Sequence, residues 1–345
     1  MKKLLTFVSA ISAGAIGTAA ADVSVSGSGT FYYSNASGST VNTVQDDSMS
    51  VTGGSVAFAM STETSNGITV SGSASITADT DDIAEIAGTA PGDQGVVGGM
   101  SSLTFGMDGM TVSVGDVDNA GSGTGEGGDV ATFASTHAGA YAGTAAAASA
   151  NDSAMDGIAD GTGINVSTSM GAASIDLTYV SKVGSGRNSL LSLASTTGYS
   201  AGYAINVGFD MAGASVNVAA GGSQAKATAT DNNTAVAAEV SYPASDALTL
   251  TVGGSSGTIA GGDEDNVFIA ASYAMDADTT LSLGYGKGDN TTASVLDKQT
   301  ATTVNVSRSL GGGVSVFAEY ASVSNDNGAA GTSGSAMTVG TSVSF

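Results

Sequence analysis

The sequence predicts an all-β fold: a closed antiparallel transmembrane β-barrel of about 16 strands. Three observations lead to this prediction. The chain opens with an export signal, and its remainder alternates apolar with small polar residues. Its last segment, "SAMTVGTSVSF", keeps this alternation to the final residue. Because successive strand side chains point to opposite faces, each such segment would have one apolar face and one small, polar face.

Residues 1–21 have the pattern of a secretory signal peptide. Lys2 and Lys3 precede an apolar stretch, Leu4–Ile16, which ends before Ala19-Ala20-Ala21. This order of basic residues, apolar stretch and A-x-A cleavage site is typical of exported proteins. The apolar stretch is too short to span a bilayer as a helix. We therefore expect export to the periplasm, cleavage near Ala21, and a mature chain of residues 22–345.

The composition is glycine-rich and acidic. The 345 residues include 51 glycines, 2 prolines and no cysteine, so disulfides and thiol chemistry are excluded. Removing Lys2 and Lys3 leaves 6 basic against 31 acidic residues, a net charge of 6 − 31 = −25. Such a surface repels nucleic acid and attracts cations. No mature stretch approaches 18 consecutive apolar residues, so no transmembrane helix is expected.

The alternating segments follow one another along the whole mature chain. In order, they are Val23–Tyr33, Val56–Met60, Ile68–Ile76, Leu103–Met107, Met110–Val114, Ile164–Met170, Ile175–Tyr179, Tyr199–Met211, Val216–Val218, Val236–Tyr242, Leu248–Val252, Val267–Met275, Leu281–Tyr285, Val304–Val306, Val314–Tyr320 and Met337–Phe345. Turn-forming residues separate several of them, including Asp108-Gly109, Gly171-Ala172 and Gly311–Gly313. Short turns at one rim and long loops at the other are typical of transmembrane barrels.

The hairpin "LTFGMDGMTVSV" has the most informative pattern. Asp108-Gly109 is a two-residue turn signal. It would place three apolar pairs on one face, Met107–Met110, Phe105–Val112 and Leu103–Val114. A register slip of one residue would destroy this match, so the sequence specifies the register.

A β-sandwich is the alternative architecture for many alternating strands. Its outward faces would carry charged residues, whereas here the non-apolar positions are mostly Ser, Thr, Gly, Ala and Asn. A barrel in a bilayer needs apolar side chains outside and small polar ones inside, and closure leaves no unpaired edge. Aromatic residues at the ends of apolar rows suit the membrane interface, namely Tyr33, Tyr199, Tyr242, Tyr273 and Phe345.

With these features, residues 22–345 resemble a Gram-negative outer-membrane porin of the general diffusion type. "LTFGMDGMTVSVGDVDNA" resembles the hairpin and the opening of the inward-folded third loop in that family, and terminal Phe345 resembles the signal read by the outer-membrane assembly machinery. The resemblance implies a homotrimer in the outer-membrane lipid bilayer. It also implies a water-filled channel for passive diffusion of ions and small hydrophilic solutes, no enzyme activity, and a last strand that pairs with the first.

Residues 117–161 form the longest stretch between alternating segments. Structureless loops of this length are unusual and are normally functional. By resemblance, this stretch is the constriction loop that folds into the lumen. It contains "HAGAYAGTAAAASA", where the alanines favour a short helix, although a flexible low-complexity spacer is equally compatible with them.

The candidate pore-lining residues are mostly acidic. They are Asp118, Glu126, Asp129, Asp152, Asp156 and Asp160 in the loop, and Asp176, Lys182, Glu239 and Glu319 at inward positions of strands. Porins of this family usually set a cluster of arginines and lysines against the acidic loop. Here Lys182 is the one clear inward base, with Arg187 a few residues beyond. Carboxylates around a water-filled constriction favour cations, so we expect a cation-preferring channel.

Other functions fit parts of the sequence. A secreted acidic surface-layer protein or Ca²⁺-binding β-solenoid suits the composition, and Asp263, Glu264 and Asp265 could bind Ca²⁺. However, no short repeat is iterated. Gly123–Gly128 matches G-x-G-x-x-G without a surrounding βαβ pattern, and a single histidine, His137, excludes a histidine metal cluster. We expect no other cofactor. A substrate-specific outer-membrane channel stays open, because it would differ only in lumen residues.

Overall fold

The computed structural model describes residues 22–38, 46–77, 100–141, 153–156, 158–183, 199–225, 232–259, 262–290, 297–326 and 332–345. The predicted signal peptide, Asp152 and Arg187 lie outside these residues. The side chains of Lys182 and Tyr199 also lie outside the described part, although their backbones belong to strands.

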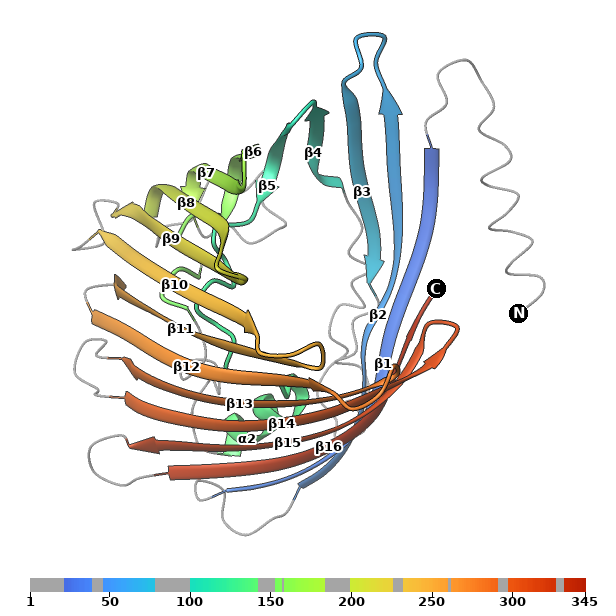
Figure 1. Cartoon of the computed structure of the whole chain (residues 1–345), viewed down its shortest axis with the longest axis vertical. Coiled ribbons are helices and arrows are strands. Elements are labelled where there is room, and N and C mark those ends of the chain that lie inside the picture. The colour runs from blue at the N-terminus through green and yellow to red at the C-terminus, as the bar shows by residue number, and fades with distance from the viewer. Residues whose placement is uncertain are drawn as a thin grey trace, which may run out of the picture.

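Sixteen antiparallel strands form one closed barrel in which each strand pairs with its neighbours in sequence (Figure 1). The first eight are β1 (Asp22–Gly38), β2 (Asp46–Glu63), β3 (Thr69–Thr77), β4 (Met100–Met107), β5 (Met110–Val117), β6 (Gly161–Met170), β7 (Ala173–Val183) and β8 (Tyr199–Met211). The others are β9 (Ala214–Ala225), β10 (Asn233–Pro243), β11 (Leu248–Ile259), β12 (Gly262–Ala274), β13 (Thr279–Asn290), β14 (Asp297–Gly311), β15 (Val314–Asp326) and β16 (Thr332–Ser344). The predicted fold class and strand number are confirmed.

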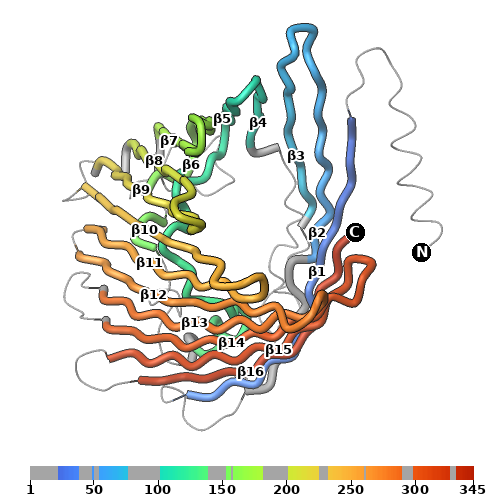
Figure 2. The backbone as a smooth tube through the Cα atoms, viewed as in Figure 1, coloured from blue at the N-terminus to red at the C-terminus, as the bar shows by residue number. Residues whose placement is uncertain are grey.

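The barrel closes between β1 and β16, as predicted. Phe31 pairs with Thr341 and Tyr33 with Val339. At the end of the chain, Phe345 exchanges two backbone hydrogen bonds with Gly27, each 3.0 Å long. Figure 2 shows the C-terminus beside the β1 trace. The last residue therefore extends the closing ladder.

The predicted hairpin register is also confirmed. Met107 pairs with Met110, Phe105 with Val112 and Leu103 with Val114 across β4 and β5. The turn glycine Gly109 has a φ of 72°, and Gly171 in the next predicted turn has a φ of 64°. Glycine adopts this left-handed conformation without the steric cost of a side chain.

Strands such as β10 and β12 present one apolar, exposed face and one buried face of mostly small residues. On β10, Val236 is 55% exposed, whereas Ala235 and Ala237 are each 4% exposed. On β12, Val267 is 61% exposed and Phe268 only 5%. We call these the apolar face and the polar face of the barrel. An exposed apolar face is what a lipid-embedded barrel requires.

One helix, α2 (Thr132–Tyr141), packs against β16, β15 and β1 (Figure 1). It begins five residues before the predicted alanine-rich tract, most of which lies outside the described residues. No helix in the described part of the chain is long and apolar enough to cross a membrane.

The buried apolar residues join the 117–161 segment to the strands. One cluster packs Val117, Met155 and Ile158 against Val180 and against alanines of β8, β9 and β10. A second packs Ala131, Ala134 and Ala138 of α2 and its N-terminal flank against small residues of β1, β14, β15 and β16. Small side chains on the polar face leave room for this segment to lie directly on the strands.

Candidate functional site

The candidate site is the segment of residues 117–161 together with the polar face that it contacts. The segment starts at the end of β5 and is fastened there by one hydroxyl. Thr178 Oγ1, on β7, accepts a hydrogen bond from the Ala120 N–H at 2.9 Å and donates one to the Asp118 carbonyl at 3.1 Å. Nearby, the Asn119 amide donates to the Met155 carbonyl, which joins the outgoing and returning parts of the segment.

The middle of the outgoing part lies against β10, β11 and β12. Asn266 donates its side-chain amide to the Gly125 carbonyl at 3.0 Å, and the Gly125 N–H donates to Glu239 Oε2 at 3.4 Å. Gly125 has a φ of 89° and lies on the Gly254 backbone, so a side chain there would be both strained and obstructed. Glycine at these positions allows backbone to pack on backbone.

The N-terminus of α2 is capped by a carboxylate from a distant strand. Ala131 precedes the helix and has no side chain that could accept the free N–H groups of the first turn. Glu319 Oε2, on β15, accepts the N–H groups of Phe133 and Ala134 instead, both at 3.0 Å. The other oxygen of this carboxylate accepts the Asn305 amide at 3.1 Å. Glu319 is only 5% exposed. Because solvent screens its carboxylate little, the charge acts mainly on the N-terminus of the helix that it contacts.

Asp129 holds the same helix end from within the segment. Its Oδ1 accepts the Ala131 N–H at 2.9 Å and the Ser135 hydroxyl at 2.8 Å. The Thr303 hydroxyl donates to the Gly128 carbonyl at 2.8 Å, which fastens the approach to β14. Two carboxylates therefore stabilise one helix start.

An aromatic cluster fixes the face of α2. The Phe133 ring stacks on Phe317 of β15 with centroids 5.3 Å apart and lies 4.7 Å from Tyr32 of β1. His137, one turn later, meets Tyr32 edge-on at 5.8 Å. Such aromatic pairs add to the free energy gained by burial. The helix is thus held by charge, hydrogen bonds and ring packing together.

The predicted acids that the structure describes fall into four groups. Glu239, Glu319 and Asp129 hydrogen-bond to the segment's backbone, as described above. Asp118 and Asp176 line a pocket of about 390 Å³ on the polar face, together with Asp116, which the sequence analysis missed. Asp156 and Asp160 are exposed, and Asp156 accepts the Ser122 hydroxyl at 3.4 Å. Glu126 is half-buried, with one oxygen shielded from solvent.

Sequence reasoning missed the residues that fasten the segment, namely Tyr32, Thr178, Ser255, Asn266, Thr303 and Phe317. Ser255, for example, accepts the Ala154 N–H of the returning part at 2.7 Å. Alternation does place each of these residues opposite the apolar rows. It gives no means of choosing them among the many small polar residues on that face.

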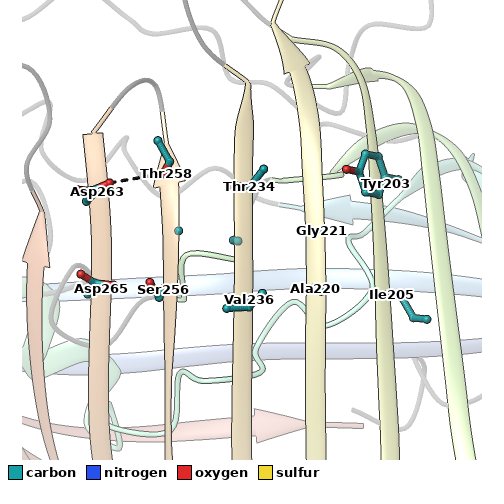
Figure 3. Close-up of a pocket in the computed structure, with 12 residues that line it drawn as sticks. Tyr203, Ile205, Ala220, Gly221, Thr234, Val236, Ser256, Thr258, Asp263 and Asp265 are labelled. Carbon is teal, nitrogen blue, oxygen red and sulfur yellow. Dashed lines mark hydrogen bonds between the residues drawn. The ribbon is translucent and has the colours of Figure 1, made fainter.

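The proposed calcium ligands do not converge. Asp263 and Asp265 lie on the apolar side of β12, in a groove of about 650 Å³ beside Thr258 and Ser256 (Figure 3). Glu264 has the opposite parity on the same strand. Thr258 donates to Asp263 at 3.5 Å. Among the described residues, no three His, Cys, Asp or Glu side chains lie close enough to hold a metal ion. Calcium binding stays a prediction to which this arrangement adds no support.

Arg308 Nη1 and Asp276 Oδ2 form an exposed ion pair at 3.4 Å. Asp276 lies in the turn between β12 and β13, outside the spanning strands. The Asp278 N–H, at 2.9 Å, holds the pKa of the Asp276 carboxyl below its ordinary value, with smaller help from Thr279 and Arg308. Arg308 also donates a hydrogen bond to the Thr279 hydroxyl at 2.8 Å. Its side chain therefore contacts the β12–β13 turn and its flank, and not the polar face of the barrel.

Comparisons with known proteins agree with this geometry. The family model described as Gram-negative porin matches residues 6–328. Comparison with curated proteins found no sequence match.

Solved outer-membrane proteins share the fold at low identity. A loop-deletion mutant of OmpT from Vibrio cholerae is 12% identical, with a TM-score of 0.65, 94% of this chain covered and 99% of that one. The outer-membrane channel DcaP of Acinetobacter baumannii is 10% identical, with a TM-score of 0.64 and coverages of 94% and 97%. A mutant of the Rh. blastica porin is 20% identical, with a TM-score of 0.56 and coverages of 94% and 100%.

The alternating strands, the closed sixteen-strand barrel with its exposed apolar face, and the family match over nearly the whole chain lead to one conclusion. The chain belongs to the Gram-negative porin family and is a channel-forming β-barrel of the bacterial outer membrane.

Proposed function

We propose that the protein is a general diffusion porin whose water-filled lumen passes ions and small hydrophilic solutes, with a preference for cations. In this proposal the polar face lines the lumen and residues 117–161 narrow it. One observation supports it above all. The segment is fastened to the polar faces of β7, β10, β12, β14 and β15, and none of its described contacts with strands is to the apolar face.

The proposed preference for cations follows from the charges near the path that ions would take through the lumen. Residues 117–161 contain no lysine or arginine. Asp116, Asp118 and Asp176 face the pocket at the start of the segment, and Asp156 and Asp160 are exposed. Salt screens charges more than about 8 Å from the ion path at physiological ionic strength. These nearby carboxylates therefore matter more than the net charge of the whole chain.

A planar bilayer under a KCl gradient tests the preference. The zero-current potential should report K⁺ over Cl⁻, and its magnitude should fall as the salt concentration rises, because screening weakens the carboxylates. Small neutral solutes should pass freely in liposome swelling. A zero-current potential that reports Cl⁻ preference at low salt would contradict the proposal and would assign the narrowest point to bases such as Lys182 and Arg187.

A substrate-specific channel is the alternative that keeps the same barrel. Saturation of the flux of one solute class, with slow passage of others of equal size, would favour it. A linear dependence of flux on concentration for sugars, amino acids and nucleosides alike would support general diffusion.

A further inference from the structure

The apolar face is hollowed along β11. Two adjoining hollows lie there, of about 650 Å³ and about 720 Å³, and Val236 and Ser256 line both of them. Neither is lined by a described residue of the 117–161 segment, which lies against the polar face at this level through Gly125 and Asn266. Both hollows therefore open on the outside of the barrel wall. We call the pair the β11 groove.

The lower hollow is apolar, and the strand register explains its depth. Ala238 of β10 pairs with Gly254 of β11, which pairs in turn with Val267 of β12. On the other side, Ala238 pairs with Val218 of β9. All four residues have the parity of the apolar face, and Val267 is 61% exposed. An alanine beside a glycine thus leaves a furrow between two valines, and small residues of this kind allow close packing against the wall within a bilayer.

The upper hollow is polar and lies nearer the rim at which β11 ends. Ser256 pairs with Asp265, and Thr258 pairs with Asp263. Figure 3 shows these four side chains on the two neighbouring strands. Among the described residues that line this hollow there is no lysine or arginine. Odd-numbered strands run in one direction, so this is also the rim at which β5 ends and the 117–161 segment starts. Transmembrane barrels have their long loops outside the cell, so this end of the groove faces the outer leaflet.

Tyr203 of β8 lines the far side of the upper hollow and is 57% exposed. It pairs with Gly222 of β9. A Cβ atom on Gly222 would lie 3.0 Å from the Tyr203 hydroxyl, so the tyrosine lies over this glycine. In Figure 3 the hydroxyl points toward Thr234, which pairs with Gly222 from β10. The upper hollow is therefore bounded by an aromatic ring on one side and by two carboxylates on the other.

We infer that the β11 groove binds one membrane lipid that has an uncharged saccharide head. Its chain lies on Ala238 and Gly254, and its head contacts the side chains of the upper hollow. Hydroxyl groups both donate and accept hydrogen bonds, which suits a lining of carboxylates, hydroxyls and a phenol. A phosphate head would be repelled by Asp263 and Asp265, because like charges in contact are costly.

The length of the groove fits a single lipid. From Thr258 to Val252 the strand runs for about 20 Å. One leaflet of a bilayer with its headgroups is about equally deep, at roughly 20 Å. The order of the side chains along β11, from hydroxyls at the rim to glycine and valine below, matches the order of head and chain in a lipid. This inference rests on the membrane location of the apolar face and does not depend on the selectivity of the channel.

Dodecyl maltoside is the probe, because it joins an uncharged disaccharide to one alkyl chain. It is titrated into the full-length protein in octaethylene glycol dodecyl ether, which has the same chain and no sugar, and native mass spectrometry counts the maltoside retained. We expect saturable retention of one maltoside per chain, and no retention of free maltose. Asp265→Ala should raise the apparent Kd about three- to tenfold, because it removes a charged acceptor at an exposed position. Ala238→Leu should raise it further, because the larger side chain fills the furrow.

Asp326→Ala and Ala318→Leu are the matched controls. They make the same changes on β15, outside the groove, at positions with the parity of exposed Tyr320. Both should retain maltoside as the unaltered protein does. Equal retention in all four variants, or an equal loss in all four, would overturn the inference.

Two further outcomes would also overturn it. Equal retention of free maltose would show that the chain of the lipid is not recognised. A change of oligomeric state in Ala238→Leu, with maltoside retention unchanged, would assign the groove to a neighbouring copy of the protein. Single-channel conductance in KCl should be normal in every variant, so a failure of the proposed channel function would be seen separately, in the unaltered protein.

Discussion

At the scale of single residues, carboxylates of this barrel have two separate tasks. Glu319 and Asp129 stabilise backbone N–H groups at the start of α2, and Asp118 and Asp176 line an open pocket. The difference lies in the partner that each carboxylate finds. A carboxylate directed at the unpaired N–H groups of a helix start is neutralised locally, whereas one in a pocket remains available to solutes. The count of acids alone therefore overstates the charge presented to ions.

Replacing Glu319 should loosen α2. An unmade helix cap costs about 1–2 kcal/mol, which corresponds to roughly five- to thirtyfold in an opening equilibrium. In Glu319→Ala, amide hydrogen exchange within Thr132–Tyr141 should speed up by about this factor, and in Glu319→Gln by less, because a weaker acceptor remains. Glu239→Gln is the control, since Glu239 accepts one longer bond from Gly125 and none from the helix. Unchanged exchange in Glu319→Ala would show that Asp129 and side-chain packing hold α2 without Glu319.

Asp276 gives the clearest pH dependence outside the spanning strands. Its folded-state pKa is lowered from the ordinary 3.8, so ionised Asp276 favours the folded state. That contribution is fully present above the unfolded-state pKa and is lost as the pH falls through the folded one. Asp276→Asn should therefore unfold slightly more readily at neutral pH, and the difference should vanish in strong acid. Thermal melts of both proteins across this pH range would measure the difference in stability. A difference in melting temperature that increases in acid would contradict a lowered pKa for Asp276.

At the scale of elements, the terminal strand completes the barrel in two ways. The Phe345 backbone pairs with Gly27 through two hydrogen bonds, and its ring covers the place where a Gly27 side chain would lie. An aromatic ring packed over a glycine of the neighbouring strand supplies the side-chain contact that the glycine itself lacks. The same residue is 67% exposed, so it covers Gly27 without being buried itself.

Deleting Phe345 should reduce the amount of protein that reaches the outer membrane, while the surviving channels keep their single-channel conductance. The reason is that the residue lies at the end of the barrel wall, away from the 117–161 segment. Phe345→Ala serves as the comparison, because it keeps the backbone pair and removes only the ring. Normal yield from both variants would contradict a role as an assembly signal, and altered conductance would place Phe345 near the ion path.

At the scale of the whole molecule, the barrel is a wall built from a simple repeating pattern, and the described parts of the irregular 117–161 segment pack against its polar face. The apolar face exposes large side chains such as Tyr203, Val267 and Ile269, which lipid or a neighbouring protomer would cover. The resemblance to general diffusion porins implies that part of this face is shared between three copies.

Trimerisation is the prediction at this scale. In mild detergent, the protein should elute from native sizing at the mass of three chains, and mild heating should release monomers that keep their β-sheet circular dichroism. The expected cause is burial of apolar surface between barrels, with the lumen and the 117–161 segment of each copy complete in itself. Elution as a monomer in every mild detergent would contradict trimerisation, but it would not contradict the barrel fold or the channel function.

The amino-acid sequence by itself determined the wall. Alternation with a period of two, turn glycines such as Gly109 and Gly171, and the matched pairs of the Leu103–Val114 hairpin all operate between near neighbours. Local patterns of this kind specify which face is apolar, where the chain turns and which register a hairpin adopts. Closure by β1 and β16 followed because a bilayer tolerates no unpaired edge.

Only the tertiary structure decided how the 117–161 segment lies on that wall. The contact of Phe133 with Glu319 joins residues 186 positions apart, and that of Gly125 with Asn266 joins residues 141 apart. No periodicity of the sequence links such positions. Whether they come into contact depends on the curvature of the sixteen-strand barrel and on which small side chains of the strands leave space for the backbone of the segment. For the same reason the sequence could count the acids, but only the folded barrel could separate those that stabilise α2 from those that face the pocket.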